Sequence, residues 1–407
     1  MQGRDPDRVR RRRVFYVPGY DPFHPRRYRE LYRTESAAQA AISGYDIALA
    51  GKAGQGHGWK VAATTEGHEV AAEIEVLVWS DIVRESMSHG ILATYLQLAR
   101  TVRAYVGSGA IFRLVRLRKG PSIAALFPVV ALLAQLALAL LAGWGGAWLC
   151  ATVFAAAGLP ASIGWLAMPV LVWAVLWRFR KADGRIYAYY LMHDYAFTAQ
   201  DGGAVPEALE VRLAEFGERI SAALAEDWDE VLVVGHSSGA HLAVSVLADV
   251  IRAGRVAANG PALGFLSLGH VVPMAAFLPR ARRLRGDLAF LSARDELTWV
   301  DVTAPGDGCA FALCDPVSVC GVAPEGKRWP LVISAAFTQT LSPERWRALR
   351  WRFFRLHFQY LCAFDRPGDY DYFQITAGPR TLAARFRNRT PSKSRIEVPL
   401  NRFRDVA

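Results

Sequence analysis

Residues 120–177 contain no Asp, Glu, Lys or Arg, and this is the feature that most limits what the chain can fold into. The run of about 58 residues is too long for one membrane span, which needs roughly 20 apolar residues. Gly143-Trp144-Gly145-Gly146 and Gly158-Leu159-Pro160 interrupt it. We therefore predict two transmembrane helices, at about 122–142 and 159–177. A shallow re-entrant hairpin and a helical hairpin buried in a soluble protein are the alternatives.

The residues beside this apolar stretch predict its orientation. Basic residues cluster before and after it, whereas the connection between the two predicted spans carries none, and positive residues favour the cytoplasmic side of a membrane. Both flanks, and with them both termini, are therefore expected in the cytoplasm. The clustered basic residues are Arg113, Arg116, Arg118 and Lys119 before the stretch, and Arg178, Arg180, Lys181 and Arg185 after it.

The net charge of +11 does not indicate a nucleic-acid partner. Six Arg against two Asp in residues 1–13, and eight Lys or Arg against two acids in residues 377–407, account for nearly all of it. A nucleic-acid-binding domain would instead gather its basic residues on a folded face. We interpret these two segments as basic tails. The five cysteines show no CxxC spacing, so neither a disulfide framework nor a structural zinc site is expected.

The remaining residues show the pattern of an α/β domain. A short apolar run at Arg13–Val17 predicts a buried strand that enters a turn at Pro18-Gly19-Tyr20. Further segments have the alternation of strands or the periodicity of helices. Strands are expected at Tyr45–Ala50, Trp59–Thr65 and Glu69–Trp79, and helices at Arg26–Tyr32, Ala204–Glu226 and, with a cationic amphipathic character, Arg345–Arg355.

The most informative segment surrounds Ser237. The β-branched run Val231–Val234 leads into Gly235-His236-Ser237-Ser238-Gly239, and a strong helix pattern follows at Ala240–Arg252. A GxSxG motif between a buried strand and a helix is the context of a nucleophile elbow, in which a sharp turn lifts the serine above the sheet edge. Gly235 and Gly239 would allow the strand and the helix to approach closely, and His236 is expected to pack without a chemical role.

With this segment the chain resembles the α/β-hydrolase superfamily of serine esterases and lipases, over about residues 14–100 and 186–375. The resemblance implies a mostly parallel sheet with helices on both faces, here interrupted by the two-helix transmembrane hairpin. It also implies the chain order nucleophile, acid, histidine. His357 is the one histidine beyond residue 270 and is therefore the expected base.

The acid and the oxyanion donors follow from the same resemblance. Superfamily acids lie on a loop after a late strand, which favours Asp307 after the expected strand Thr298–Thr303; Asp301 and Asp315 are the alternatives. The oxyanion would be bound by the backbone N–H of Ser238 and by one from the early turn, either Gly19 or Tyr20.

These interpretations predict a membrane-anchored serine hydrolase that cleaves a carboxylic ester, such as a lipid-derived one, through a Ser-His-Asp triad. The alternative is a non-catalytic, hydrolase-like membrane scaffold or partner-binding protein. Thioester, amide or acyl-transfer chemistry would use the same residues. Membrane lipids and a small-molecule or lipid ester are the expected partners; no metal or cofactor motif is present, and no oligomeric state is predicted. The expected divisions are residues 1–13 (tail), 14–119 (first hydrolase part), 120–177 (hairpin), 178–376 (second hydrolase part) and 377–407 (tail).

Overall fold

The computed structural model describes residues 5–51, 56–87 and 90–406, and the chain divides into two compact units. Unit 1 comprises Met1–Arg84, Ala110–Pro121 and Asp201–Ala407, and unit 2 comprises Glu85–Gly109 and Ser122–Gln200. Unit 2 therefore extends beyond the predicted insertion at 120–177 on both sides. The first four residues of the predicted N-terminal tail, and the last residue of the C-terminal one, lie outside the described residues.

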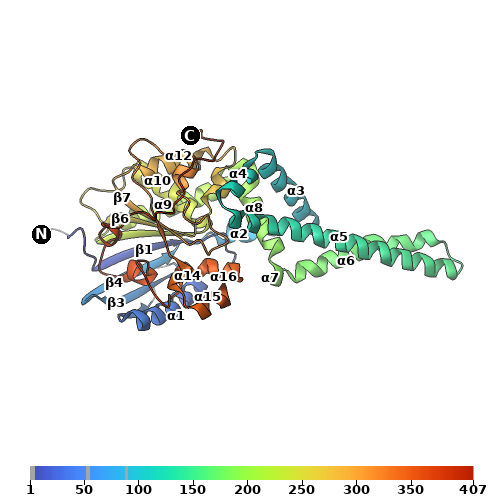
Figure 1. The fold of residues 1–407 in the computed structure, drawn as a ribbon, viewed down its shortest axis with the longest axis horizontal. Helices are drawn as coiled ribbons and strands as arrows, with labels where there is room; N and C mark the ends of the chain where they lie inside the picture. Colours follow the sequence, from blue (N-terminus) through green and yellow to red (C-terminus); the bar gives the residue numbers. More distant parts are fainter. Residues whose placement is uncertain (1–4, 52–55, 88–89, 407) are drawn as a thin grey trace. The chain divides into compact units, whose positions relative to one another are not determined.

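Unit 1 is built on an eight-stranded sheet with the order β2-β3-β4-β1-β5-β6-β7-β8 (Figure 1). Six neighbouring strands of the sheet, β4, β1, β5, β6, β7 and β8, are parallel. The pairs β2–β3 and β3–β4 are antiparallel. The strands are β1 (Arg11–Val17), β2 (Asp46–Gly51), β3 (Gly58–Thr65), β4 (His68–Val76), β5 (Glu230–His236), β6 (Ala262–Leu268), β7 (Leu297–Thr303) and β8 (Leu331–Ser334).

Helices cover both faces of this sheet (Figure 1). On one face lie α9 (Glu207–Leu224), α10 (Ser238–Arg252) and α12 (Arg282–Ser292), and on the other lie α1 (Arg26–Ser43) and several short helices. Every residue of β5 is buried, as expected for a parallel strand covered on both faces. The expected α/β class with a mostly parallel sheet is confirmed. The other helices of unit 1 include α4 (Ala110–Leu117), α11 (Val272–Ala276), α13 (Pro316–Val319), α14 (Phe337–Thr340), α15 (Pro343–Leu349), α16 (Phe353–His357), α17 (Tyr372–Ala377) and α18 (Leu382–Phe386).

Two features of unit 1 differ from the sequence interpretation. The expected cationic helix at Arg345–Arg355 is instead the two short helices α15 and α16, separated by residues 350–352. The strand expected to reach Trp79 ends at Val76 in β4, and three residues separate it from the helix α2 (Ser80–Ser86). The short 3₁₀ segment η2 (Gln200–Gly203) precedes α9. A second one, η3 (Phe358–Leu361), follows α16 directly.

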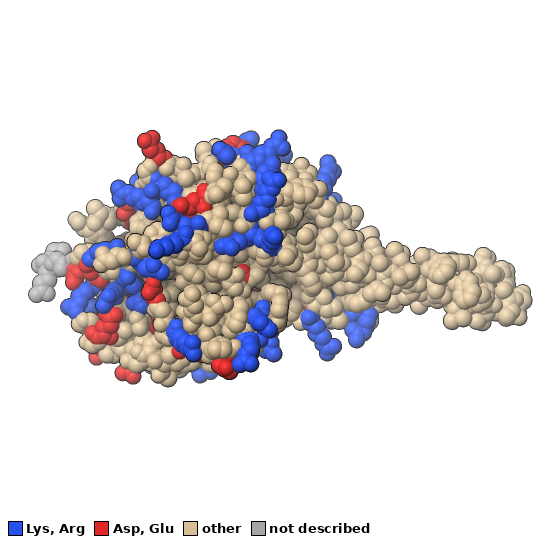
Figure 2. Space-filling model, in the orientation of Figure 1, with Lys and Arg blue, Asp and Glu red and all other residues tan. Residues whose placement is uncertain are grey.

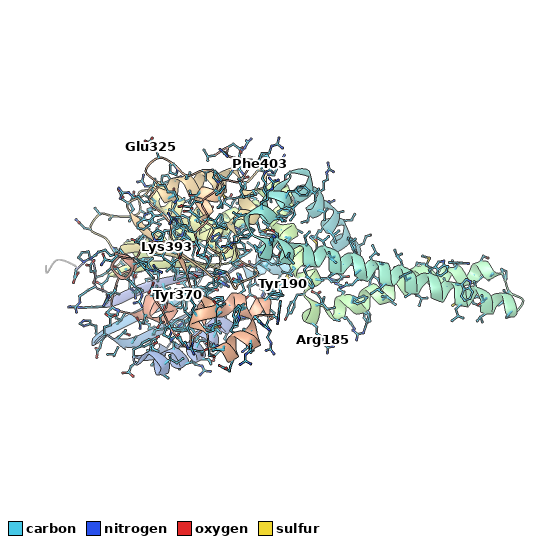
Figure 3. All side chains as sticks on the ribbon, viewed as in Figure 1. Arg185, Tyr190, Glu325, Tyr370, Lys393 and Phe403 are labelled. Atoms are coloured by element: carbon cyan, nitrogen blue, oxygen red, sulfur yellow. The ribbon has the colours of Figure 1, made fainter. Side chains whose placement is uncertain are left out.

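The two predicted basic tails are integrated into unit 1. Residues 11–13 belong to β1, and the fully buried Arg12 contacts Glu230 on β5, with 2.6 Å between Nε and Oε2. Glu230 also accepts a hydrogen bond from the backbone of Leu382 on α18. Figure 3 labels Lys393 and Phe403 on the C-terminal segment, whose buried Asn401 donates to Ala276. The buried Arg12 is thus paired with a buried acid and with the backbone carbonyls of Gly378 and Arg380, which net charge alone could not show.

Unit 2 is helical. Its long helix α5 (Lys119–Ala156) has its first three residues in unit 1, and a 3₁₀ turn η1 (Ala161–Leu166) continues into α6 (Ala167–Lys181). The helix α3 (Ile91–Gly107) packs against α8 (Ala188–Ala199), where His193 Nδ1 lies 2.9 Å from Gln97 Oε1. A single turn, α7 (Asp183–Ile186), joins α6 to α8.

The predicted break at Gly143–Gly146 is wrong, because α5 continues through it for 38 residues. These glycines allow α6 to approach closely: a Cβ at Gly143 would lie 2.6 Å from Val172, and one at Gly146 would lie 2.3 Å from Leu171. Small residues at a helix–helix contact are typical of apolar hairpins. The predicted break near Gly158 is present, since α5 ends at Ala156.

Two helices of unit 2 are long and apolar enough to cross a membrane, Lys119–Ala156 and Ala161–Lys181. In their most apolar stretches 28% and 11% of the residues are buried, so most of their apolar side chains are exposed. The space-filling view shows no charged side chain along most of this hairpin (Figure 2). At about 1.5 Å per residue, α5 is longer than a hydrocarbon core of roughly 30 Å. The predicted first span, 122–142, is therefore only part of its helix.

Candidate active site

The candidate residues lie where the parallel strands of unit 1 end. The sheet register places Val17 beside Gly235, and Leu268 beside both His236 and Val302. The carboxyl ends of β1, β5, β6 and β7 therefore meet at one edge of the sheet. Ligands of open α/β sheets bind outside this edge.

Ser237 occupies a sharp turn between β5 and α10. Its backbone has φ 57° and ψ −122°, a conformation that non-glycine residues adopt only under strain of about 1–3 kcal/mol. The turn is closed on both sides by glycines. A Cβ at Gly235 would lie 2.7 Å from Ala240 Cα, and one at Gly239 would lie 2.1 Å from the carbonyl of Val17. The GxSxG spacing is thus required by close backbone packing around Ser237.

The Pro18-Gly19-Tyr20 turn lies against Ser237. A Cβ at Gly19 would lie 3.0 Å from Ser237 Cβ and 3.4 Å from its Oγ, so a side chain here would crowd the hydroxyl. The indole Nε1 of Trp79 donates to the Pro18 carbonyl at 2.9 Å and holds the turn in place. Tyr20 packs edge-on against the same indole. The Pro18-Gly19-Tyr20 turn therefore lies directly beside the Ser237 hydroxyl.

His357 and Asp307 form a buried pair. The imidazole Nδ1 of His357, at the end of α16, donates to Asp307 Oδ2 at 2.7 Å. The other ring nitrogen, Nε2, is buried and has no hydrogen-bond partner among the described residues. The ring is held by its carboxylate on one side while its second nitrogen remains available, as a general base requires.

Three donors keep the Asp307 carboxylate ionised. Burial alone raises the pKa of a carboxyl group, but the adjacent His357 ring and several hydrogen bonds outweigh it and lower the pKa of Asp307 below its ordinary value. The backbone N–H of Cys309 donates to Oδ1 at 2.9 Å, and the Tyr360 hydroxyl donates to Oδ2 at 3.1 Å. Burial raises the pKa of Tyr360, so this hydroxyl keeps the proton that it donates.

The alternative acids contact other groups. Asp301 is buried inside β7, where it accepts a hydrogen bond from Ser267 Oγ at 2.6 Å, and burial raises its pKa. Asp315 caps α13 through the N–H groups of Val317 and Ser318, and Lys327 Nζ lies 2.6 Å from its other oxygen. Of the three candidates, the structure brings Asp307 to His357.

Two residues gain roles that the sequence interpretation missed. His236 Nε2 donates to the backbone carbonyl of His357 at 3.0 Å, and the two rings lie 4.8 Å apart. Burial and the neighbouring His357 lower the pKa of His236 to about 3, so it acts here as a neutral donor that joins the turn of Ser237 to α16. Tyr360 is also a neutral donor, and its hydroxyl donates to the Asp307 carboxylate. A polar residue inside an elbow and a tyrosine three positions after the expected base were the available signals.

The Asp307–His357 pair and the nearby Cys309 could together offer ligand atoms to a metal ion. Cys309, Asp307 and His357 each present a possible ligand atom, all within 4.8 Å of one another, and thiolate, carboxylate and imidazole suit Zn²⁺. Asp307 and His357 already satisfy each other through a hydrogen bond. The expectation of no resident metal or cofactor stays a prediction.

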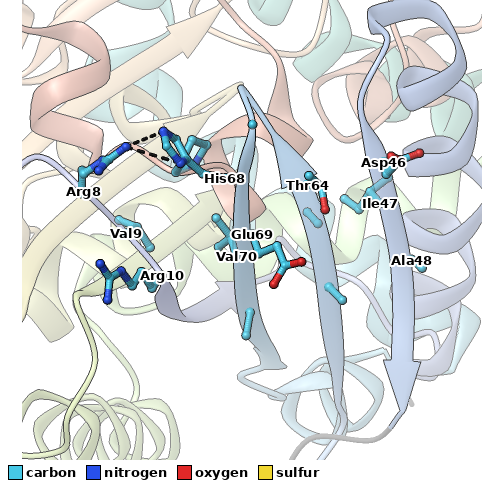
Figure 4. Close-up of a pocket in the computed structure, with 15 residues that line it drawn as sticks. Arg8, Val9, Arg10, Asp46, Ile47, Ala48, Thr64, His68, Glu69 and Val70 are labelled. Carbon is cyan, nitrogen blue, oxygen red and sulfur yellow. Dashed lines mark hydrogen bonds between the residues drawn. The ribbon is translucent and has the colours of Figure 1, made fainter.

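A separate cavity of about 940 Å³ lies at the opposite end of the sheet (Figure 4). Arg8 before β1, His68 at the start of β4 and Thr64 near the end of β3 line it, and Arg8 is hydrogen-bonded to the His68 ring. Since Ser237 follows the carboxyl end of β5, this cavity is remote from the candidate nucleophile.

Comparison with known proteins adds no relative: no family model, curated protein or solved structure matches this chain.

Proposed function

We propose that this protein is a serine hydrolase with an α/β-hydrolase-like fold. The observation that carries the proposal is the strained Ser237 turn at the end of β5, with the Asp307–His357 pair at the same edge of the sheet. A buried His–Asp pair beside a serine in a nucleophile elbow is the arrangement of acyl-transfer catalysis. In particular, we propose a carboxylic ester as the substrate.

In the proposed mechanism His357 accepts and then donates a proton in each of two half-reactions. His357 Nε2 takes the proton of Ser237 as Oγ forms a bond to the acyl carbon, and then gives it to the departing alcohol as the ester C–O bond breaks. Water, deprotonated by His357, then releases the carboxylic acid and regenerates Ser237. Asp307 orients the ring and stabilises its protonated form. The N–H of Ser238, together with that of Gly19 or Tyr20, stabilises the oxyanion.

The setting we propose is a membrane. The two exposed apolar helices would cross the bilayer, with both basic flanks, both termini and the active site on the cytoplasmic side. Membrane lipids would then surround the apolar parts of α5 and α6, and lipid-derived esters would be the natural substrates.

One observation favours the alternative of a non-catalytic scaffold with this fold. His357 Nε2 has no hydrogen bond to Ser237 in the part of the chain that the structure describes. Catalytic hydrogen bonds are often long or poorly aligned in unliganded enzymes and tighten when substrate binds. A chemical test of Ser237 separates the two functions.

That test is covalent labelling by a fluorophosphonate, which reacts with serines activated by a neighbouring base. We expect the detergent-solubilised wild type and Ser221→Ala, a variant of a serine on α9 outside the elbow, to be labelled. Ser237→Ala is expected to show no label by in-gel fluorescence. Equal labelling of Ser237→Ala, or no labelling of the folded wild type, would contradict the hydrolase and support the scaffold.

The proposed topology predicts which positions face the outside of intact cells. A cysteine at the exposed Ala157, between α5 and η1, should react with a membrane-impermeant maleimide, whereas one at the exposed Lys393 should react only after cell lysis. Wild type measures the background from the native cysteines. A re-entrant hairpin would leave both positions protected in intact cells, and labelling of Lys393→Cys there would overturn the cytoplasmic assignment.

A further inference from the structure

A cavity of about 880 Å³ lies beside the candidate acid. Three segments of unit 1 line it: residues 115–121 around the start of α5, residues 305–312 after β7, and residues 346–353 at the junction of α15 and α16. Its volume is within the range of sites for small ligands. Asp307 and Gly308 are among the lining residues, so the cavity adjoins the Asp307–His357 pair.

The segment that leads into α5 is attached to the loop of the acid. Arg118 Nε donates to the carbonyl of Ala312 at 2.8 Å, and a Cβ at Gly120 would lie 3.5 Å from Gly308 Cα. The start of the first candidate membrane helix therefore lies against the loop that carries Asp307. A molecule in this cavity would touch both the acid's loop and the start of that helix.

The charge of this cavity is strongly positive. Arg116, Arg118, Lys119 and Arg350 line it, and the single acid among the lining residues, Asp307, is already bonded to His357. Arg116, Lys119 and Arg350 are exposed and have no ion-pair partner among the residues that the structure describes. Elsewhere in unit 1 comparable arginines are paired: Arg13 with Glu73, Arg212 with Asp81, and Arg380 with Glu66.

The same cavity has an aromatic wall. Trp346, Trp351 and Phe353 line it, and the side chains of Trp351 and Phe353 are 72% and 48% exposed. A Cβ at Gly306 would lie 2.7 Å from the Trp346 ring, so this indole packs directly against the loop of Asp307. Unpaired cations next to exposed aromatic rings suit a ligand with an anionic end and an apolar chain.

We propose that this cavity binds the phosphate-bearing end of an amphiphilic ester, which the proposed hydrolase then cleaves. The claim that the bound molecule is a substrate rests on the proposed function. Arginine side chains bind phosphate oxygens through charge-assisted, bidentate hydrogen bonds, and basic residues at a bilayer surface attract anionic head groups. The aromatic wall would contact the first part of the acyl chain.

The first experiment compares two esters with one acyl chain, 1-hexanoylglycerol 3-phosphate and 1-hexanoylglycerol, as monomers with the detergent-solubilised full-length protein. We expect the wild type to prefer the phosphate in kcat/KM, and Arg116→Gln/Arg350→Gln to reduce this preference by about 10- to 100-fold. Because the readout is a ratio, a general loss of activity cancels. Arg347→Gln, next to the cavity but outside its lining, is the matched control.

The second experiment does not need catalysis. Glycerol 3-phosphate is titrated into the Ser237→Ala protein, with Trp346 and Trp351 as fluorescent reporters, and saturable quenching lost in the double variant is expected. If quenching occurs but the substrate ratio is unchanged, the cavity holds a head group other than the substrate's, and the substrate part is overturned. No saturable quenching overturns the site itself. Failure of fluorophosphonate labelling would remove the hydrolase while leaving this titration valid.

Discussion

Ser237→Ala and His357→Ala are each expected to lower kcat for ester hydrolysis by about 10⁵- to 10⁶-fold, and the double variant is expected to lower it no further. The reason is that the serine hydroxyl and the imidazole act as one unit: without the base the nucleophile stays protonated, and without the nucleophile the base has no proton to accept. The measurement is the release of p-nitrophenol from p-nitrophenyl butyrate by purified, detergent-solubilised protein.

The controls for this prediction separate chemistry from folding. Ser237→Ala should keep the wild-type thermal unfolding midpoint within a few degrees, because it leaves the backbone of the turn intact. His357→Ala removes the buried partner of the Asp307 carboxylate, so that variant and the double variant are compared with wild type only at temperatures where their unfolding curves show folded protein. A residual activity within about 100-fold of wild type in Ser237→Ala would mean that another group attacks the ester. Additive losses in the double variant would mean that the two residues act independently, which contradicts the mechanism.

Local sequence signals predicted much of the fold. The β-branched run before Ser237 became β5. The strands expected at Tyr45–Ala50, Trp59–Thr65 and Glu69–Trp79 became β2, β3 and β4, with bounds shifted by at most three residues. These segments have clear alternation or continuous apolar character, which burial of one or both faces imposes. The close contact of Gly235 with Ala240 is also local, whereas that of Gly239 is with Val17 on a distant strand.

The errors arose where one residue type serves two physical purposes. Glycines at 143–146 were interpreted as helix breakers, yet in α5 they admit Val172 and Leu171 of the neighbouring helix. Arg12 was counted as part of a basic tail, yet it is fully buried against Glu230. Only tertiary contacts distinguish these cases, because both glycine and arginine are compatible with either role in the sequence.

The site shows the same division between local and long-range information. The Ser237 turn could be predicted because its glycines and its strand are contiguous in sequence. The contacts made by Tyr360, by His236 and by the Gly19 turn could not be predicted. Each joins residues that are far apart in the sequence and meet only in the folded chain. The cavity beside Asp307 joins three segments from different regions of unit 1 and therefore has no contiguous motif at all.

Asp307→Asn is expected to lower kcat by about 10⁴-fold, or roughly 5.5 kcal/mol in the barrier, with little change in KM. An amide at this position can no longer stabilise the protonated imidazole, and its NH₂ group can force the wrong tautomer of His357. Because the pKa of Asp307 lies below its ordinary value, the wild-type carboxylate is charged throughout pH 6–8, and the loss should extend across that range. The measurement is kcat for p-nitrophenyl butyrate at several pH values.

Asp301→Asn is the matched comparison, because Asp301 lies six residues earlier on β7 and contacts Ser267 instead of His357. Burial raises the pKa of Asp301, so burial disfavours a negative charge there, and the amide oxygen of an Asn of the same shape can still accept the hydrogen bond from Ser267 Oγ. We expect less than about a 10-fold loss of kcat in this variant. If Asp301→Asn lost as much activity as Asp307→Asn in folded protein, the assignment of the acid to the loop after β7 would be wrong. A large effect confined to Asp307 would instead connect the hydrogen bond at His357 Nδ1 to the chemistry at Ser237.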